Sequence, residues 1–530
     1  MTGKTNTAFS LWFALIVYWG LTYMFLIVSL RSSDGHFVYP LDDTYIHMAI
    51  AKHFVNNGSW GVDQNGFSSS TSSPLWTLLI AISYKIWGVN PWSPFILSLL
   101  FGSLVICYCH QLLHDNTNSL RLLLLLIVIS LLVPLPIMTL TGMEHVLQGL
   151  SALLLIYSAA NYLSKTRFDF YLYMLLIALA NLATVTRYEG ILLVFSISLL
   201  FLVKKRFWEG FFFTVTSLLS VTIYGFVSLA NGWYFLPNSV LLKGNMPSLT
   251  LEGISAFFWK MISNFYSAPH VIVLLIACLI LYLWRKDELK EKGKLLIVLS
   301  TLATFAHMQF AEVGWFFRYE SYIVLILGVV LMDMLNNYVF PKFSQIKNRN
   351  FYDYSIMILL LFLFLIPLTI RISTAFMQYP KAITNIYEQQ YQMGLFLKKY
   401  YQGKCVAADD IGAINYLANI YTIDLYGLAN MDVTRLRLSH SYNKNEINQL
   451  TLNNDVQVVV IHSSWFNAEI PDHWIEVGKW KISNNVVAVR DDISFYATSD
   501  LFKTNLINNL IEFSHLLPST VEQSGIYISP

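Results

Sequence analysis

The sequence predicts a polytopic α-helical membrane protein that ends in a soluble α/β domain. Three observations lead to this fold class: only 12% of the 530 residues are charged, the mean hydropathy is +0.52, and the last part of the chain has no long apolar run. Soluble domains usually contain about 25% charged residues. Most of the chain is therefore expected in a lipid bilayer, and a net charge of +2 gives no indication of a nucleic-acid partner.

The first apolar segment, residues 9–30, is long enough to cross a bilayer core of about 30 Å. Lys4 precedes the segment. A signal peptide would have a shorter apolar region and a small-residue cleavage site. We therefore expect an uncleaved anchor with a cytoplasmic N-terminus.

About eleven spans are expected in all. Residues 75–87 are too few for a comfortable crossing, so they are expected to form a re-entrant or surface-lying helix beside the bilayer. The other spans are expected near residues 95–113, 121–140, 145–163, 170–186, 190–203, 211–231, 270–284, 295–310, 320–338 and 353–372.

Basic residues set the orientation of these spans. With the N-terminus inside, every basic turn falls on the cytoplasmic side, as the positive-inside rule requires. Counting 75–87 as a span would instead place the basic clusters at 204–206 and 285–294 outside. The favoured orientation sends the first loop, 31–74, and the other polar loops outward. These loops contain Asp42, Asp43, Glu144, His145, Arg187, Glu189, Asn238, Lys243, Glu312, Arg318 and Glu320.

We expect a membrane domain at residues 1–372 and a soluble α/β domain at 373–530. Within the latter, an amphipathic helix is expected at 379–401 and a hairpin at 474–490. Strands are expected at 405–408, 420–425 and 456–462. The four cysteines have neither the spacing of a disulfide framework nor that of a zinc site.

Two adjacent acids in the first outer loop, Asp42 and Asp43, are the candidate catalytic residues. A partly desolvated carboxylate pair can have one pKa raised, and such a carboxylate can accept the proton of an attacking hydroxyl group. Asp42 is favoured over Asp43 as the base. One alternative is that Asp42 caps a helix beginning near Thr44. Another is that one acid orients its neighbour or holds a divalent cation.

Three cations are candidates for binding a donor phosphate: Arg187, Arg318 and Lys243. Arginine offers a fork of donors to phosphate oxygens. Snorkelling at the end of a span is the alternative, above all for Lys243. Arg187 and Arg318 each precede a glutamate by two residues, so a structural ion pair is also open for both.

Five further residues are candidates for contacting the substrate: Glu144, His145, Glu189, Asn238 and His47. The alternatives are that Glu144 and His145 cap the following helix, and that His47 is an ordinary packed histidine. Later in the chain, the motif Asp409-Asp410-Ile-Gly-Ala413 follows an expected strand. A ligand-facing loop and an ordinary acidic turn explain it equally well, so no catalytic role is assigned to it.

Several short motifs together resemble the GT-C superfamily of polytopic glycosyltransferases, in particular bacterial members similar to the mycobacterial terminal β-(1→2)-arabinofuranosyltransferases. The motifs occur in family order over most of the chain. They are Leu41-Asp-Asp-Thr-Tyr-Ile46, Ser73-Pro-Leu-Trp76, Thr141-Gly-Met-Glu144, Ala183-Thr-Val-Thr-Arg-Tyr-Glu-Gly190, Leu236-Pro-Asn-Ser239, Asp410-Ile-Gly-Ala413 and Ile423-Asp-Leu-Tyr-Gly-Leu428. Tyr188 departs from the pattern, since many relatives have proline there, and this weakens the transfer of a precise role to Arg187.

The resemblance implies an inverting transfer of a sugar from a polyprenyl-phosphate donor at the periplasmic face of a bacterial inner membrane. It also implies that Asp42 or Asp43 is the general base and that 75–87 packs beside the active site. Arabinofuranose is the sugar of the nearest-looking relatives, and other pentoses and hexoses stay open. The acceptor would be an envelope glycan, a lipid-linked glycan or a surface protein such as pilin. The rival interpretations are a transporter or lipid-linked glycan flippase and a noncatalytic scaffold.

Overall fold

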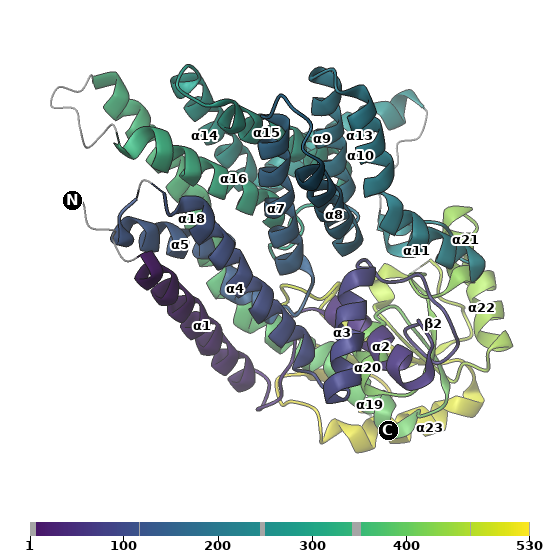
Figure 1. The fold of residues 1–530 in the computed structure, drawn as a ribbon. Coiled ribbons are helices and arrows are strands. Elements are labelled where there is room, and N and C mark those ends of the chain that lie inside the picture. Colours follow the sequence, from purple (N-terminus) through teal and green to yellow (C-terminus); the bar gives the residue numbers. More distant parts are fainter. Residues whose placement is uncertain (1–6, 116, 244–249, 342–350, 467, 529–530) are drawn as a thin grey trace. The chain divides into compact units, whose positions relative to one another are not determined.

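The computed structural model describes residues 7–115, 117–243, 250–341, 351–466 and 468–528. The chain divides into two compact units. The first, a helical unit, comprises Met1–Phe25, Phe95–Ile223 and Gly244–Phe376. The second, the sheet unit, comprises Leu26–Pro94, Tyr224–Lys243 and Met377–Pro530. Residues 31–74, expected from the sequence to form the first outer loop, therefore fold together with the C-terminal residues (Figure 1).

Within the described residues, seven helices are long and apolar enough to cross a membrane, and a bent pair raises the number to eight. Three shorter apolar helices bring the apolar segments into agreement with the eleven expected spans. The long helices are α1 (Thr7–Arg31), α4 (Ser93–Leu113), α7 (His145–Leu163), α10 with α11 (Phe207–Ser217, Leu219–Ala230), α15 (Glu291–Phe310), α16 with η1 (Ser321–Met334, Leu335–Val339) and α18 (Phe351–Ile386). The bent pair is α13 (Leu251–Ser267) with α14 (Pro269–Arg285), and the shorter helices are α5 (Ser119–Leu132), α8 (Phe170–Thr186) and α9 (Gly190–Val203).

The helices α7 and α16 form the interior of the helical unit. In each of these two helices, 83% of the residues in the most apolar stretch are buried, whereas the share is only 33% in α1 and in α4. Small residues allow the inner helices to approach closely. At Gly328 on α16, an added Cβ would lie 2.6 Å from the side chain of Leu132. The outer helices leave apolar side chains exposed, as helices that face lipid do.

The sheet unit contains a six-stranded sheet in the order β2-β1-β3-β5-β4-β6. The strands β2, β1 and β3 are parallel, and the remaining pairs are antiparallel. The run of Val458 to Ile461 is buried at every position, as expected for a central strand. The strands are β1 (Cys405–Ala408), β2 (Tyr421–Asp424), β3 (Val458–Ile461), β4 (Ile475–Lys481), β5 (Asp492–Ala497) and β6 (Glu522–Ser524).

The strands expected at 405–408, 420–425 and 456–462 are confirmed as β1, β2 and β3. The hairpin expected within 474–490 is wrong in extent, because the partner of β4 begins only at Asp492. The connection is longer because Asn485 accepts hydrogen bonds from the amides of Val487 and Ala488 and forms a turn there.

The helix expected at 379–401 is confirmed, and it continues from α18 without a break. The π-helical turn η2 (Tyr387–Tyr391) joins α18 to α19 (Gln392–Tyr400). The sheet unit also contains α20 (Gly412–Leu417), α21 (Met431–Leu438), α22 (Lys444–Asn453) and α23 (Asp500–Ser514).

The expected first outer loop contains α2 (Asp42–Asn57), and the segment expected at 75–87 forms α3 (Pro74–Trp87). The hydroxyl of Ser73 accepts a hydrogen bond from the amide of Trp76, and Pro74 occupies the first helical position, so α3 begins where its sequence predicts. The helix α2 packs against α3 and against α20. The segment expected at 75–87 is therefore a helix, and its place relative to a bilayer remains a prediction.

Candidate active site

Asp42 and Asp43 occupy the first turn of α2. The N-cap of this helix is Leu41, which makes no capping side-chain bond. Asp42 therefore does not cap its own helix, and that alternative is wrong. The two carboxylates nevertheless lie where the dipole of α2 favours negative charge.

The Asp42 carboxylate joins α2 to the start of α20. Its Oδ2 accepts a hydrogen bond from the amide of Gly412 at 2.8 Å, and its Oδ1 accepts one from Ala413 at 2.8 Å. A Cβ on residue 412 would lie 2.1 Å from the backbone oxygen of Asp42 and 2.6 Å from Oδ2. The Asp-Ile-Gly-Ala motif thus supplies both the donors and the space for the carboxylate, which its sequence did not reveal.

A second acid, Asp410, lies just before Gly412 and Ala413 and influences the pKa of Asp42. Burial and the negative charge of Asp410 raise the pKa of Asp42 well above its usual value, against the two amide hydrogen bonds. Burial also raises the pKa of Asp410, although the charge of His462 opposes the rise. Gln390 donates from Nε2 to Asp410 Oδ2 at 2.7 Å. Two acids whose titrations interact in this way share protons as a pair.

A buried ion pair lies at the carboxyl ends of two neighbouring parallel strands. Asp409 follows β1 and His462 follows β3, and their Oδ2 and Nδ1 atoms are 2.8 Å apart with both side chains fully buried. Burial alone would lower the pKa of His462, but Asp409 and the other nearby acids raise it to about 9. Sequence reasoning missed His462; its position directly after a buried strand was the only available signal.

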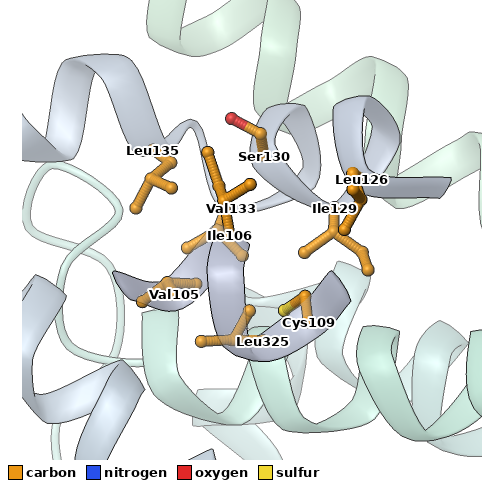
Figure 2. A pocket seen from close by; sticks show the side chains of 9 residues that line it. All are labelled: Val105, Ile106, Cys109, Leu126, Ile129, Ser130, Val133, Leu135 and Leu325. Carbon is orange, nitrogen blue, oxygen red and sulfur yellow. The ribbon is translucent and has the colours of Figure 1, made fainter. Parts of the chain in front are cut away.

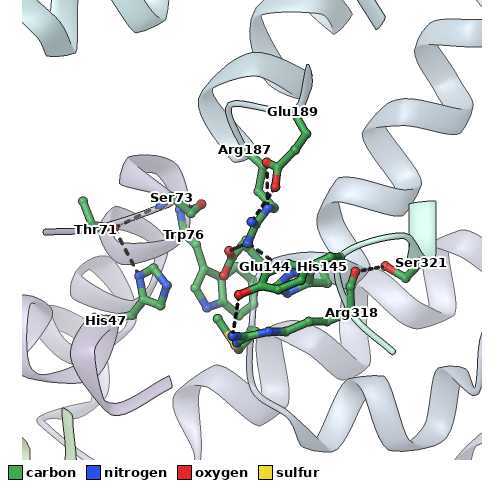
Figure 3. Close-up of polar contacts among 12 residues, drawn as sticks. His47, Thr71, Ser73, Trp76, Glu144, His145, Arg187, Glu189, Arg318 and Ser321 are labelled. Carbon is green, nitrogen blue, oxygen red and sulfur yellow. Dashed lines mark hydrogen bonds and ion pairs between the residues drawn. The ribbon is translucent and has the colours of Figure 1, made fainter. Parts of the chain in front are cut away.

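In the helical unit, Arg187 is the centre of a second polar cluster (Figure 3). Its guanidinium group donates two bonds to Glu189, at 3.0 and 2.6 Å, and one to Glu144 at 2.6 Å. The third partner of Arg187 is His145, whose Nε2 lies 3.0 Å from Nη1 of the arginine. Burial would raise the pKa of Glu189, but the charge and hydrogen bonds of Arg187 hold it below its usual value.

Arg318 lies in the same unit and is only 1% exposed. Its Nη1 contacts the sulfur of Met143 at 2.8 Å, and its Nη2 donates to the hydroxyl of Tyr319 at 3.2 Å. The ring of Tyr319 also lies 5.7 Å from the guanidinium carbon of Arg187. Sequence analysis overlooked Tyr319, although the residue directly follows Arg318.

The two ion pairs that the sequence left open have different outcomes. For Arg187, the pair with Glu189 is confirmed. For Arg318, a pair with Glu320 is wrong, because Glu320 instead binds Arg371 at 2.9 Å and His270 at 3.2 Å. Arg371 reaches it from within the apolar helix α18, a partner that no local sequence pattern indicated.

The remaining candidates lie in the sheet unit. His47 contacts the hydroxyls of Thr77 at 2.8 Å and Thr71 at 3.2 Å and is 2% exposed. Its contact with substrate stays a prediction. Asn238 is fully buried and donates to the Gly427 carbonyl and the Thr434 hydroxyl. The side chain of Lys243 lies outside the described residues.

Two voids lie between the helices of the helical unit. Each has a volume of about 10 Å³, which is at the lower limit for holding one water molecule. The first is lined by apolar side chains of α4, α5 and α16 together with Ser130 (Figure 2). The second reaches His145. Neither void is large enough for a prenyl chain.

Over the described part of the chain, no three His, Cys, Asp or Glu side chains are grouped so as to hold a metal ion. Among the described residues, Asp42 and Asp43 therefore do not belong to a group of three such ligands.

Comparison with known proteins gives one family match and several similar structures. Residues 383–496 match the family described as a domain of unknown function, DUF8728. No curated protein matches the chain.

The crystal structure of ArnT from Cupriavidus metallidurans bound to undecaprenyl phosphate is similar, with a TM-score of 0.52 and 11% identity over 92% of this chain and 98% of that chain. The apo form of ArnT gives a TM-score of 0.52 and 12% identity over 91% of this chain and 98% of that chain. At such identities the likeness establishes the fold alone. The expected GT-C-like membrane fold with a C-terminal α/β domain is therefore confirmed.

Proposed function

We propose that the protein is an inverting membrane glycosyltransferase that takes its sugar from a polyprenyl-phosphate donor. The observation that carries the proposal is the Asp42 carboxylate, held by two amides and raised in pKa by burial and by Asp410. A carboxylate of this kind suits a general base. The likeness to a fold solved with bound undecaprenyl phosphate supports the lipid-phosphate donor.

In the proposed reaction, the acceptor hydroxyl oxygen attacks the anomeric carbon while Asp42 takes its proton. The bond between that carbon and the phosphate oxygen breaks, and the lipid phosphate leaves with the electron pair. One displacement of this kind inverts the anomeric configuration. Asp43 is the neighbouring acid and the second choice as the base.

The cations of the helical unit are proposed to bind the donor phosphate. Arg318 is the first choice, because its guanidinium group is buried and contacts Met143 and Tyr319. Arg187 already binds two glutamates, so we assign it mainly to positioning them. Lys243 is retained as a third phosphate ligand.

Glu144, His145 and Glu189 are proposed to contact the hydroxyl groups of the sugar or the acceptor. They form one polar cluster with Arg187, and carboxylates accept hydrogen bonds from sugar hydroxyls. For Asn238 and His47 we propose a supporting role, since both are buried and hydrogen-bonded within the protein.

The finer assignments extend the same proposal. Arabinofuranose is the first sugar to test, and the acceptor is an envelope glycan, a lipid-linked glycan or a surface protein such as pilin. The site and the sheet unit are proposed to face the periplasm of a bacterial inner membrane. The motif at 41–46 and the turn at 410–413, which contact one another through Asp42, support the resemblance to arabinofuranosyltransferases.

The proposal is tested with purified protein and a panel of polyprenyl-phosphate pentoses and hexoses. Release of the bare lipid phosphate is followed with and without an envelope glycan fraction. We expect release from one donor class, with transfer of its sugar to the acceptor. Movement of a lipid-linked glycan across a vesicle membrane without release of lipid phosphate would instead favour a flippase.

A further inference from the structure

A continuous set of buried side chains connects His462 to the neighbour of Asp42. His462 Nδ1 contacts Asp409 at 2.8 Å, and its Nε2 lies 3.3 Å from Gln389 Oε1. Gln390 Nε2 donates to Gln389 Oε1 at 2.9 Å and to Asp410 Oδ2 at 2.7 Å. We call these five residues, Gln389, Gln390, Asp409, Asp410 and His462, the histidine array.

The two glutamines can both join the array because the helix is locally widened. Gln389 and Gln390 lie in the π-turn η2 between α18 and α19. In a regular α-helix, successive side chains point about 100° apart, and π-turns are frequent at functional sites. The turn brings neighbouring residues to the same buried network, where both are at most 1% exposed.

The array holds fewer hydrogen bonds than its polar atoms allow. Among the described residues, Asp409 Oδ1 and Gln390 Oε1 are buried and have no hydrogen-bond partner. Leaving buried polar atoms unsatisfied costs about 1–3 kcal/mol each.

Several titratable groups surround the array. They are Asp43, Tyr45 and Asp42 from α2, Tyr391 from η2, Asp409 and Asp410 after β1, His462 after β3 and Asp492 at the start of β5. His462 supplies the positive charge that acts on Asp410. Asp410 in turn is the largest charged influence on Asp42.

We infer that the histidine array positions charge for the reaction: His462, fixed by Asp409, keeps Asp410 ionised, and ionised Asp410 makes Asp42 the acid that accepts the proton of the acceptor hydroxyl. The inference rests on the proposed function. His462 and Asp410 are positioning residues, since they act through Asp42. The array assigns the proton to Asp42 rather than to Asp410, although both acids are buried and their pKa values are raised.

The direction in which the pKa of Asp42 shifts distinguishes this indirect role of His462 from a direct one. Without the charge of His462, Asp410 takes up the proton, and the pKa of Asp42 falls because its charged neighbour is gone. If His462 acted directly on Asp42, losing the cation would raise that pKa instead. A purely structural histidine would lower the turnover rate and leave the pH profile unmoved.

The test compares the pH profiles of kcat for the full-length wild-type protein, His462→Gln, Asp410→Asn and the double variant. We expect the acid limb to move to lower pH by about one unit in each single variant. No further shift is expected in the double variant. The kcat should fall, because a weaker base removes the proton less effectively, while the KM for the donor stays unchanged. Additive shifts, or a shift to higher pH in His462→Gln, would overturn the inference.

A spectroscopic titration keeps the test independent of activity. Infrared difference spectra identify the carboxylic-acid band that Asp42→Asn removes, and its midpoint is followed with pH. The band should titrate at higher pH in the wild type than in Asp410→Asn or His462→Gln. An unchanged midpoint contradicts the array, whereas a shifted midpoint in a protein that releases no lipid phosphate from any donor contradicts only the proposed function.

Two exposed residues of the sheet unit supply matched controls. His473→Gln and Asp432→Asn make the same chemical changes at exposed positions, and both should leave the profile and the band unmoved. If His462→Gln does not fold, Asp410→Asn alone decides, because an unmoved Asp42 band in this variant refutes the coupling.

Discussion

At the scale of single residues, the Asp42 carboxylate has both a structural and a chemical role. Asp42 holds the start of α20 through the amides of Gly412 and Ala413. Its raised pKa also makes it a stronger base than an ordinary aspartate. Replacing it therefore removes two functions at once, and experiments must separate them.

The pH dependence of stability follows from His462. Its pKa is raised to about 9, so its bound proton stabilises the folded state fully below the ordinary histidine pKa of about 6.5. This contribution is lost as the pH rises through about 9. Each pH unit within that window should cost up to about 1.4 kcal/mol of unfolding free energy. Thermal unfolding of wild type and His462→Gln between these pH values checks this, and parallel curves would contradict it.

The cluster around Arg187 predicts a second effect of a single residue. Arg187→Lys retains the charge but loses the paired bonds to Glu189 and the contact with Glu144, because lysine cannot donate as a fork. We expect a loss of about 1–3 kcal/mol in stability, measured as a lower unfolding temperature in detergent. The control is Lys165→Arg at the exposed pair with Asp169, where little change is expected. Equal unfolding temperatures for both variants would refute the role of the cluster.

At the scale of elements, the contact between α2 and α20 depends on Gly412. Gly412→Ala would place a Cβ 2.1 Å from the backbone oxygen of Asp42, so the two helices must separate. We expect lower stability and lower turnover, with the Asp42 carboxylate still present. Gly20→Ala is the control, since no atom lies within 4 Å of its Cβ position. Unchanged activity and stability in Gly412→Ala would mean that this contact does not position Asp42.

The apolar spans and the parallel strands could be predicted from sequence because their signals are local. A long uncharged segment predicts a span, and the run from Val458 to Ile461 predicts a buried strand. The partnership of His462 with Asp409 could not be predicted, since it joins residues brought together only by the pairing of β1 with β3. Arg371 was missed for the same reason: a lone arginine in an apolar helix resembles a snorkelling residue until Glu320 is placed beside it.

The sequence indicated the neighbours of some candidate site residues and not of others. The motifs around Glu144 and Arg187 do lie together in one polar cluster. By contrast, nothing in the local sequence around His47 indicated its contacts with Thr71 and Thr77. Hydrogen bonds of this kind depend on tertiary packing.

At the scale of the whole molecule, the orientation in the membrane is the main prediction. The positive-inside rule predicts that Thr166 lies in the cytoplasm and that Asn231 and Glu312 lie outside. All three are exposed, so single cysteines there can react with a membrane-impermeant reagent once the four native cysteines are replaced. Intact cells should label residues 231 and 312 but not 166. Labelling of 166 alone would invert the proposed orientation.

The central claim is that a carboxylate of the Asp42 and Asp43 pair accepts the proton of the acceptor hydroxyl. The most direct measurement is the rate of lipid-phosphate release for wild type, Asp42→Asn and Asp43→Asn, with unfolding temperature and donor binding measured on the same samples. We predict that Asp42→Asn abolishes turnover while the variant still folds and still binds the donor. Full activity in both variants would contradict the account.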